Sequence, residues 1–174
     1  MSNQVLETIS ERRSIRGYKP EQITKEQLDA LLKAAVESPS ASNLQPWHFS
    51  VVQNSSILKE INDEVKGILP LDIDDIFYGA PTAIFISSVA SERWARLDSG
   101  IAVQTIALAA HSLGLGSVIL GLPDHAFSGP REEYLNNLLK FPQGHSFAVA
   151  IAVGIPTTTK EAHPLEPDRI VYIK

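Results

Sequence analysis

The stretch from residue 94 to residue 113 constrains the fold more than any other part of the chain. Its apolar and small residues fall nearly all the way round a helix instead of along one stripe. These residues are Ile101, Val103, Ile106, Ala107, Leu108, Ala109, Ala110 and Leu113. Such a helix must be buried on most sides, and one domain of 174 residues has few other elements to cover it. A subunit interface would supply the cover, so we predict a homodimer. The alternative is a core helix in a monomer with a loosely attached tail.

The tail after Pro156 supports the same prediction. Its threonines and prolines do not favour an ending that packs compactly on itself, yet residues 170–173 are apolar enough to need a partner. We therefore expect a domain-swapped C-terminal arm, exchanged between the two subunits.

Apolar periodicity and turn residues predict interleaved helices and strands. Thr24 and Gln27 form a capping box, which marks the start of a helix. Helices are expected at residues 3–10, 24–36, 56–66, 94–113 and about 131–140, strands at residues 47–53, 82–89, 117–120 and 147–153, and a short extended run at residues 169–173. This order is typical of an α/β or α+β protein whose helices cover a sheet. No repeat or flexible linker divides the chain, so residues 1–174 are expected to form a single domain.

Composition argues against several classes of function. The net charge of −5 does not suit a broad basic face for nucleic acid, and the lack of cysteine excludes thiolate metal sites and a cysteine nucleophile. No apolar run suits a secretory leader or a membrane span, so we expect a cytoplasmic protein without a membrane partner. The histidines lack metal-ligand spacing and no G-x-S-x-G elbow occurs, so neither a metal site nor a serine hydrolase is expected.

Two short stretches are candidate binding segments. The densest charge lies in ERRSIR, residues 11–16, whose three arginines and serine can surround a phosphate, because guanidinium groups offer forked donors; the alternative is a solvated charged face. The second stretch is SPSASNLQPWHF, residues 38–49. Its Ser, Asn and Pro residues are ordinary in a connecting loop, and their small polar side chains also suit a binding loop.

Five motifs in order together resemble the nitroreductase family of FMN-dependent oxidoreductases. They are RRSIR, PSASNLQPWHF, GAPTAIFIS, DSGIAVQTIALAAHSLGLGSVILG and VAIAVGIP, and they span about residues 7–156. The resemblance implies an α+β fold, a nitroreductase-like three-layer sandwich with a mostly antiparallel central sheet covered by helices. It also implies a homodimer with two FMN sites at the subunit interface.

The resemblance assigns roles to residues near the N-terminus and in the loop. Arg12 and Ser14 would bind the FMN phosphate, Arg13 would line the same segment, and Arg16 would face N1 and O2 of the flavin. A cation there would stabilise the negative charge of the reduced ring. The second subunit would contribute the loop residues Pro39, Ser40, Ala41, Ser42 and Asn43. Gln45-Pro46-Trp47 would return the chain to the sheet, with Trp47 and Phe49 packed in the core.

Further roles fall on residues later in the chain. The backbone N–H groups of Leu120 and Gly121 would point at flavin N5 and O4, and no catalytic side chain is required. Lys160 would hold the phosphate, but Ala162 stands where many members have an arginine, which His163 or Arg13 would have to replace.

The acidic stretch DIDDIF departs from the pattern of larger family members. We expect Asp72, Asp74 and Asp75 to face solvent on a mobile lid, residues 67–78, with Phe77 or Tyr78 available to touch substrate.

The implied activity is ping-pong transfer of hydride from NADH or NADPH, through flavin N5, to a small acceptor such as a nitroaromatic or a quinone. One alternative is a relative with other flavin chemistry, such as dehalogenation. Another is a flavin- or anion-binding protein of the same fold without turnover, which the alanine at position 162 suggests.

Overall fold

Four antiparallel strands form the centre of the protein, in the order β1-β2-β4-β3. The strands are β1 (Trp47–Val52), β2 (Thr82–Val89), β3 (Gly116–Leu120) and β4 (His145–Gly154). This computed structural model describes residues 3–162, 164 and 166–173. Residues Ser14 and Ser117 add one parallel bridge beside β3, so the sheet is mostly antiparallel, as the resemblance implied.

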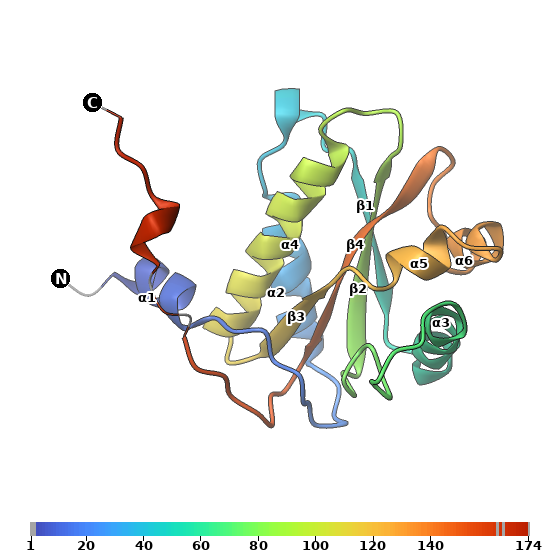
Figure 1. Ribbon diagram of the computed structural model, residues 1–174, viewed down its shortest axis with the longest axis horizontal. Helices are drawn as coiled ribbons and strands as arrows, with labels where there is room; N and C mark the ends of the chain where they lie inside the picture. Colours follow the sequence, from blue (N-terminus) through green and yellow to red (C-terminus); the bar gives the residue numbers. More distant parts are fainter. Residues whose placement is uncertain (1–2, 163, 165, 174) are drawn as a thin grey trace.

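Helices cover both faces of this sheet (Figure 1). The described helices are α1 (Gln4–Glu11), α2 (Lys25–Val36), α3 (Ser55–Ile68), α4 (Ala95–Ser112), α5 (Asp124–Phe127) and α6 (Glu132–Leu138), with short 3-10 turns η1 (Ala41–Asn43) and η2 (Pro167–Arg169). In the ribbon, α2 and α4 lie on one face and α3, α5 and α6 on the other. The three-layer α+β sandwich is therefore confirmed.

The alternating side chains of β2 explain why helices pack on both faces of the sheet. Successive side chains of a strand point to opposite faces, and β2 is buried on both. Ile84 and Ile86 pack with α2 and α4, whereas Ala83 and Phe85 pack with α3, α5 and α6. Trp47 and Phe49 lie half-buried against the α4 side, consistent with the packing role expected for them.

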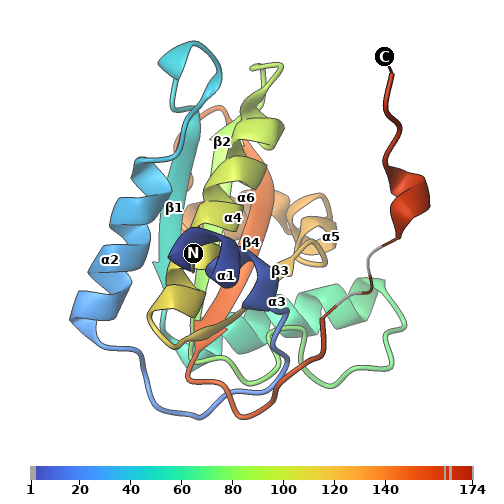
Figure 2. The ribbon, with the colours of Figure 1, turned by 90° about the vertical axis from the view of Figure 1, so that its left-hand side faces the viewer.

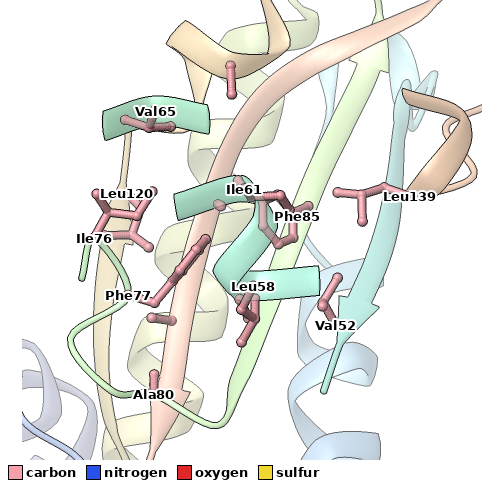
Figure 3. Close-up of a cluster of buried hydrophobic side chains, with 14 of the residues drawn as sticks. Val52, Leu58, Ile61, Val65, Ile76, Phe77, Ala80, Phe85, Leu120 and Leu139 are labelled. Atoms are coloured by element: carbon pink, nitrogen blue, oxygen red, sulfur yellow. The ribbon is translucent and has the colours of Figure 1, made fainter. Parts of the chain in front are cut away.

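Aliphatic and aromatic side chains fill the core on the α3 side, and Figure 3 shows Phe85 and Phe77 among them. The ring centroid of Phe85 lies 6.0 Å from that of Phe77, 5.9 Å from that of Phe127 and 6.3 Å from that of Phe147. Phe77 is only 1% exposed, so of the two side chains expected to touch substrate, the half-buried Tyr78 is the more accessible. The sequence did not indicate that Phe77 is buried, because the ring of a phenylalanine in an acidic loop can face either solvent or the core. The packing of the layers decides between the two.

Asp75 also differs from its expected role. Asp72 and Asp74 are exposed as predicted, but Asp75 is half-buried, and its carboxylate accepts hydrogen bonds from the backbone N–H groups of Phe77 (2.8 Å) and Gly79 (2.7 Å). An aspartate that bonds backbone donors a few residues on is a turn-forming residue. Asp75 therefore fixes the turn that drives Phe77 into the core.

Most predicted elements are found within two residues of their expected ends. The capping box at Thr24 is present, since its side chain accepts from Gln27 N and the Gln27 side chain accepts from Thr24 N. The structure adds α5 and η1, which were not predicted. Of the extended run expected at residues 169–173, Arg169 instead ends a 3-10 turn, and residues 170–173 pair with no strand of the described chain.

We expect Phe85→Ala to lower the free energy of unfolding by about 3–5 kcal/mol, because it removes the ring that three other phenylalanines contact. Denaturant unfolding followed by circular dichroism measures this loss. Val36→Ala is the control, since Val36 is 49% exposed and should change stability little. Equal midpoints for Phe85→Ala and the wild type would contradict this view of the core.

Candidate functional site

Three basic side chains and a histidine line one hollow of about 250 Å³. Arg12 and Arg13 come from the segment that leaves α1, His111 from the last turn of α4, and Lys160 from the chain beyond β4. We call this the basic hollow. The backbone at Gly116 and Ser117, where β3 begins, forms part of its wall.

Backbone hydrogen bonds hold the arginine segment against the sheet. Ile15 N donates to Ser117 O at 2.9 Å, and farther along Lys19 N donates to Ile155 O at 2.9 Å. The segment is therefore extended at this point, instead of continuing α1. Gly116 allows the close approach, because a Cβ there would lie 3.0 Å from both Ile15 Cγ2 and Pro156 Cβ.

The three basic side chains of the basic hollow have no ion-pair partner within the described chain. No described carboxylate forms an ion pair with Arg12, Arg13 or Lys160, and the one acidic side chain in the hollow, Glu11, lies 3.7 Å from His111 Nε2. Arg13 Nη1 donates to Arg12 O at 2.7 Å, but its buried Nε has no acceptor among the described residues. A buried donor without an acceptor is costly, and an anion in the hollow would satisfy it.

Arg16 lies outside this hollow and next to a tyrosine. Its guanidinium carbon is 5.6 Å from the centre of the Tyr78 ring, within the range of a cation–π contact. Tyr78 has φ of 58°, a left-handed conformation that is unusual for a bulky residue. Nearby, Tyr18 donates its hydroxyl to Ile15 O at 2.7 Å, and burial raises the pKa of Tyr18 well above its usual value.

The predicted loop residues lie in a different place. Pro39, Ser40 and Ala41 line a second hollow, of about 350 Å³. The other lining residues come from the N-terminal end of α4 and are Trp94, Leu97, Asp98 and Ile101. Ser42 and Asn43 are exposed and have φ of 50° and 55°. We call this second hollow the apolar hollow.

The basic and apolar hollows lie at opposite ends of α4. The first reaches His111 and the second reaches Asp98, and thirteen residues of α-helix separate these by about 20 Å. Figure 1 shows α1 beside the C-terminal half of α4, and η1, drawn in cyan, near the other end of that helix. Within one chain, the loop of residues 39–43 therefore lies far from Arg12 and Arg13.

The remaining predicted site residues lie in the basic hollow, along β3 or in the chain beyond β4. Lys160 joins Arg12 and Arg13, as expected, and Ser14 lies beside β3. Leu120 ends β3, so Leu120 and Gly121 lie at the far end of that strand from Gly116. Ala162 is exposed, and His163 is outside the described residues.

His111 and Asp98 are among the residues of these hollows that the sequence reading missed. His111 reaches the basic hollow only because α4 packs beside α1, so no local pattern indicates it. Asp98 had a signal, since it is the one acidic residue in the apolar stretch from 94 to 113. A lone carboxylate in a helix that must be buried needs a specific donor.

Comparison with known proteins identifies the family. The model of the nitroreductase family matches residues 9–155. A protein of Archaeoglobus fulgidus, whose name places it among NADH dehydrogenases and NAD(P)H nitroreductases, is 34% identical over 95% of each chain. A crystal structure of a nitroreductase with bound FMN from Desulfitobacterium hafniense superposes with a TM-score of 0.93, at 35% identity and with all of both chains covered. An iodotyrosine deiodinase of Thermotoga neapolitana is 28% identical over 88% of this chain and 89% of its own.

The chain belongs to the nitroreductase family, which confirms the resemblance found in the sequence. Among the described residues, no helix is long and apolar enough to cross a membrane. In the same part of the chain, no three histidine or carboxylate side chains form a group that could hold a metal ion.

We expect Gly116→Ala to lower the free energy of unfolding by about 1–3 kcal/mol, because the added methyl group would force β3 away from Ile15 and Pro156. Gly67→Ala is the matched control. Gly67 lies in α3, and no neighbouring atom lies within 4 Å of the position that an added methyl group would take, so alanine there should stabilise by about 0.5–1 kcal/mol. Thermal and denaturant unfolding of both variants measures whether the free energy of unfolding falls in Gly116→Ala and rises in Gly67→Ala. Two variants of equal stability would contradict the close approach at Gly116.

Proposed function

We propose that this protein is an FMN-dependent oxidoreductase that moves hydride from NADH or NADPH to a small acceptor such as a nitroaromatic or a quinone. The observation that supports this most directly is the basic hollow. Its unpaired cations and the buried Nε of Arg13 suit a dianionic phosphate group. The FMN held by the Desulfitobacterium hafniense relative carries such a group.

The chain's own residues then have distinct tasks. Arg12, Ser14 and Lys160 bind the phosphate, with Arg13 beside them. Arg16, placed by Tyr78, faces the pyrimidine edge of the ring, where a cation stabilises negative charge. The backbone N–H groups of Leu120 and Gly121 orient the ring. FMN itself supplies a carrier that accepts hydride from the nicotinamide and donates it to the acceptor, so no side-chain acid or base is needed.

We propose that the working molecule is a homodimer, because the two hollows complete one site only across a subunit boundary. Leu97, Ile101, Thr105 and Leu108 form one stripe along α4, in which Leu97 is 59% exposed and the other three are half-buried. Two copies of α4 related by a two-fold axis would run antiparallel along this stripe. The loop of one subunit would then lie beside the basic hollow of its partner.

Apolar surface elsewhere supports the same arrangement. Val5 and Leu6 of α1 are 66% and 63% exposed, and residues 170–173 are 63–94% exposed. Figures 1 and 2 show the described residues 166–173 lying apart from the sheet and its helices. Adjacent apolar side chains in water mark an interaction surface. We propose that residues 166–173 form an arm that packs on the partner subunit.

A second candidate is reductive dehalogenation on the same flavin, which the similarity to the Thermotoga neapolitana deiodinase favours. Both reactions use the same FMN site and differ in the acceptor. Parallel assays of NAD(P)H oxidation with a nitroaromatic, a quinone and a halogenated phenol distinguish them. FMN binding without turnover of any acceptor would instead favour a binding protein.

We expect Arg12→Ala to weaken FMN binding about 10- to 100-fold, because it removes a charge-assisted hydrogen bond to phosphate. Quenching of flavin fluorescence on titration measures the dissociation constant. Lys19→Ala is the control, since Lys19 is an exposed cation of the same segment that does not line the basic hollow. A wild-type protein that takes up no added FMN would overturn the proposed function.

The shared site can be tested by subunit complementation between Arg12→Ala and Ala41→Trp, which damages the loop side. Each variant alone should have low activity, because each of the two sites in its homodimer carries a defect. After refolding of an equal mixture, about a quarter of all sites should be intact, since half of the dimers are mixed and each mixed dimer has one undamaged site. Activity of the mixture no higher than the average of the two variants would show that both defects act within one chain.

A further inference from the structure

The loop that lines the apolar hollow has an unusual backbone. Ser42, Asn43 and Gln45 have φ of 50°, 55° and 48°, a left-handed conformation that residues other than glycine seldom adopt. Three such residues within four positions are unfavourable unless the surroundings impose them. The loop therefore needs hydrogen bonds that favour this one conformation.

Most of these bonds are made inside the loop. Ser40 accepts twice, from Gln45 N at its hydroxyl oxygen (2.9 Å) and from Asn43 N at its carbonyl (3.0 Å). Ala41 O accepts from Leu44 N at 3.1 Å. These bonds set the shape of the loop, but they do not fix its place on the rest of the protein.

Asp98 provides the side-chain hydrogen bond from α4 to this loop. Its two carboxylate oxygens lie 3.1 and 3.2 Å from Ala41 N, and its side chain is buried, with the residue 3% exposed. Asp98 lies in the first turn of α4, where the helix dipole favours a negative charge. Arg96, two residues earlier, contacts Asp124 instead, and no described cation pairs with Asp98. A buried, unpaired carboxylate is costly, so a hydroxyl or an amide would be the easier choice if the bond served stability alone.

We propose that Asp98 is a positioning residue: through Ala41 N it fixes the loop of residues 39–43 in the shape with which that loop completes the flavin site. This inference rests on the proposed function, because the loop acts there on FMN. If Asp98 is removed, Ala41 N loses its acceptor and the loop relaxes toward ordinary conformations. The fraction of protein with a competent loop then falls, and the apparent FMN affinity falls by the same factor.

The test compares Asp98→Ala, Asp98→Asn and Ser50→Ala. Asparagine keeps one oxygen for Ala41 N and has nearly the same shape, so Asp98→Asn should restore most of what alanine loses. Ser50→Ala is the stability control. It removes a buried 2.7 Å hydrogen bond to Leu139 O on the other face of the sheet, away from the loop.

Two measurements are made on each variant. Amide hydrogen exchange of Ala41, Asn43 and Leu44, without added FMN, reports loop opening. Fluorescence titration gives the FMN dissociation constant. Asp98→Ala should speed exchange of these amides and weaken FMN binding, each about tenfold or more, while Asp98→Asn stays within about threefold of the wild type. Ser50→Ala should lower the thermal midpoint and leave both readouts unchanged.

Each contrary result has a distinct meaning. Wild-type exchange and affinity in Asp98→Ala would overturn the positioning role and leave the proposed function intact. A folded Asp98→Asn as impaired as Asp98→Ala would also overturn it, because the Ala41 bond would not be what matters. A wild type that binds no FMN would refute the proposed function, while the exchange data would still decide whether Asp98 holds the loop.

Discussion

The packing of α4 on the central sheet is the interaction on which the rest of the structure depends. Ala102, Ala107 and Ala110 are fully buried, and their small side chains let the helix lie close to β2 and β4. The N-terminal end of α4 holds the loop through Asp98, and its C-terminal end brings His111 to the basic hollow. One helix therefore sets the distance between two groups of residues that are separated in the sequence. Its apolar composition is needed for packing, and two of its polar residues, Asp98 and His111, line the hollows at its two ends.

A second constraint is the close approach of three backbone segments beside β3. A Cβ at Gly17 would lie 2.8 Å from Thr158 Cγ2, and one at Gly154 would lie 3.0 Å from Tyr18 Cδ1. With Gly116, these glycines let the arginine segment, the start of β3 and the chain beyond β4 approach one another closely, because side chains of the neighbouring segments occupy the space that a Cβ would take. The basic hollow lies where these segments meet. Its cations are therefore presented by backbone that the sheet holds in place, which reduces the ordering needed when an anion binds.

Much of the fold could be predicted from the sequence, because periodicity and capping are local signals. The capping box at Thr24 and the alternating or continuous apolar runs of the strands located their elements within two residues. The errors occurred where tertiary contacts decide. The turn held by Asp75 buries Phe77, and no local pattern distinguishes that from a solvent-facing ring. For the candidate site, motifs indicated the arginines and the loop, but the contribution of His111 depends on two helices packing together.

The separation of the two hollows also bears on why the loop is strained. A loop that acted within its own subunit could adjust to a bound ring together with the rest of that chain. A loop that reaches into a partner's site has few contacts there before the ligand arrives, so its shape must be set by its own subunit. The left-handed residues Ser42 and Asn43 and the buried carboxylate of Asp98 are costs that make sense on this view. In the homodimer that we propose, local strain and the two-subunit site are both consequences of placing one site across the two ends of α4.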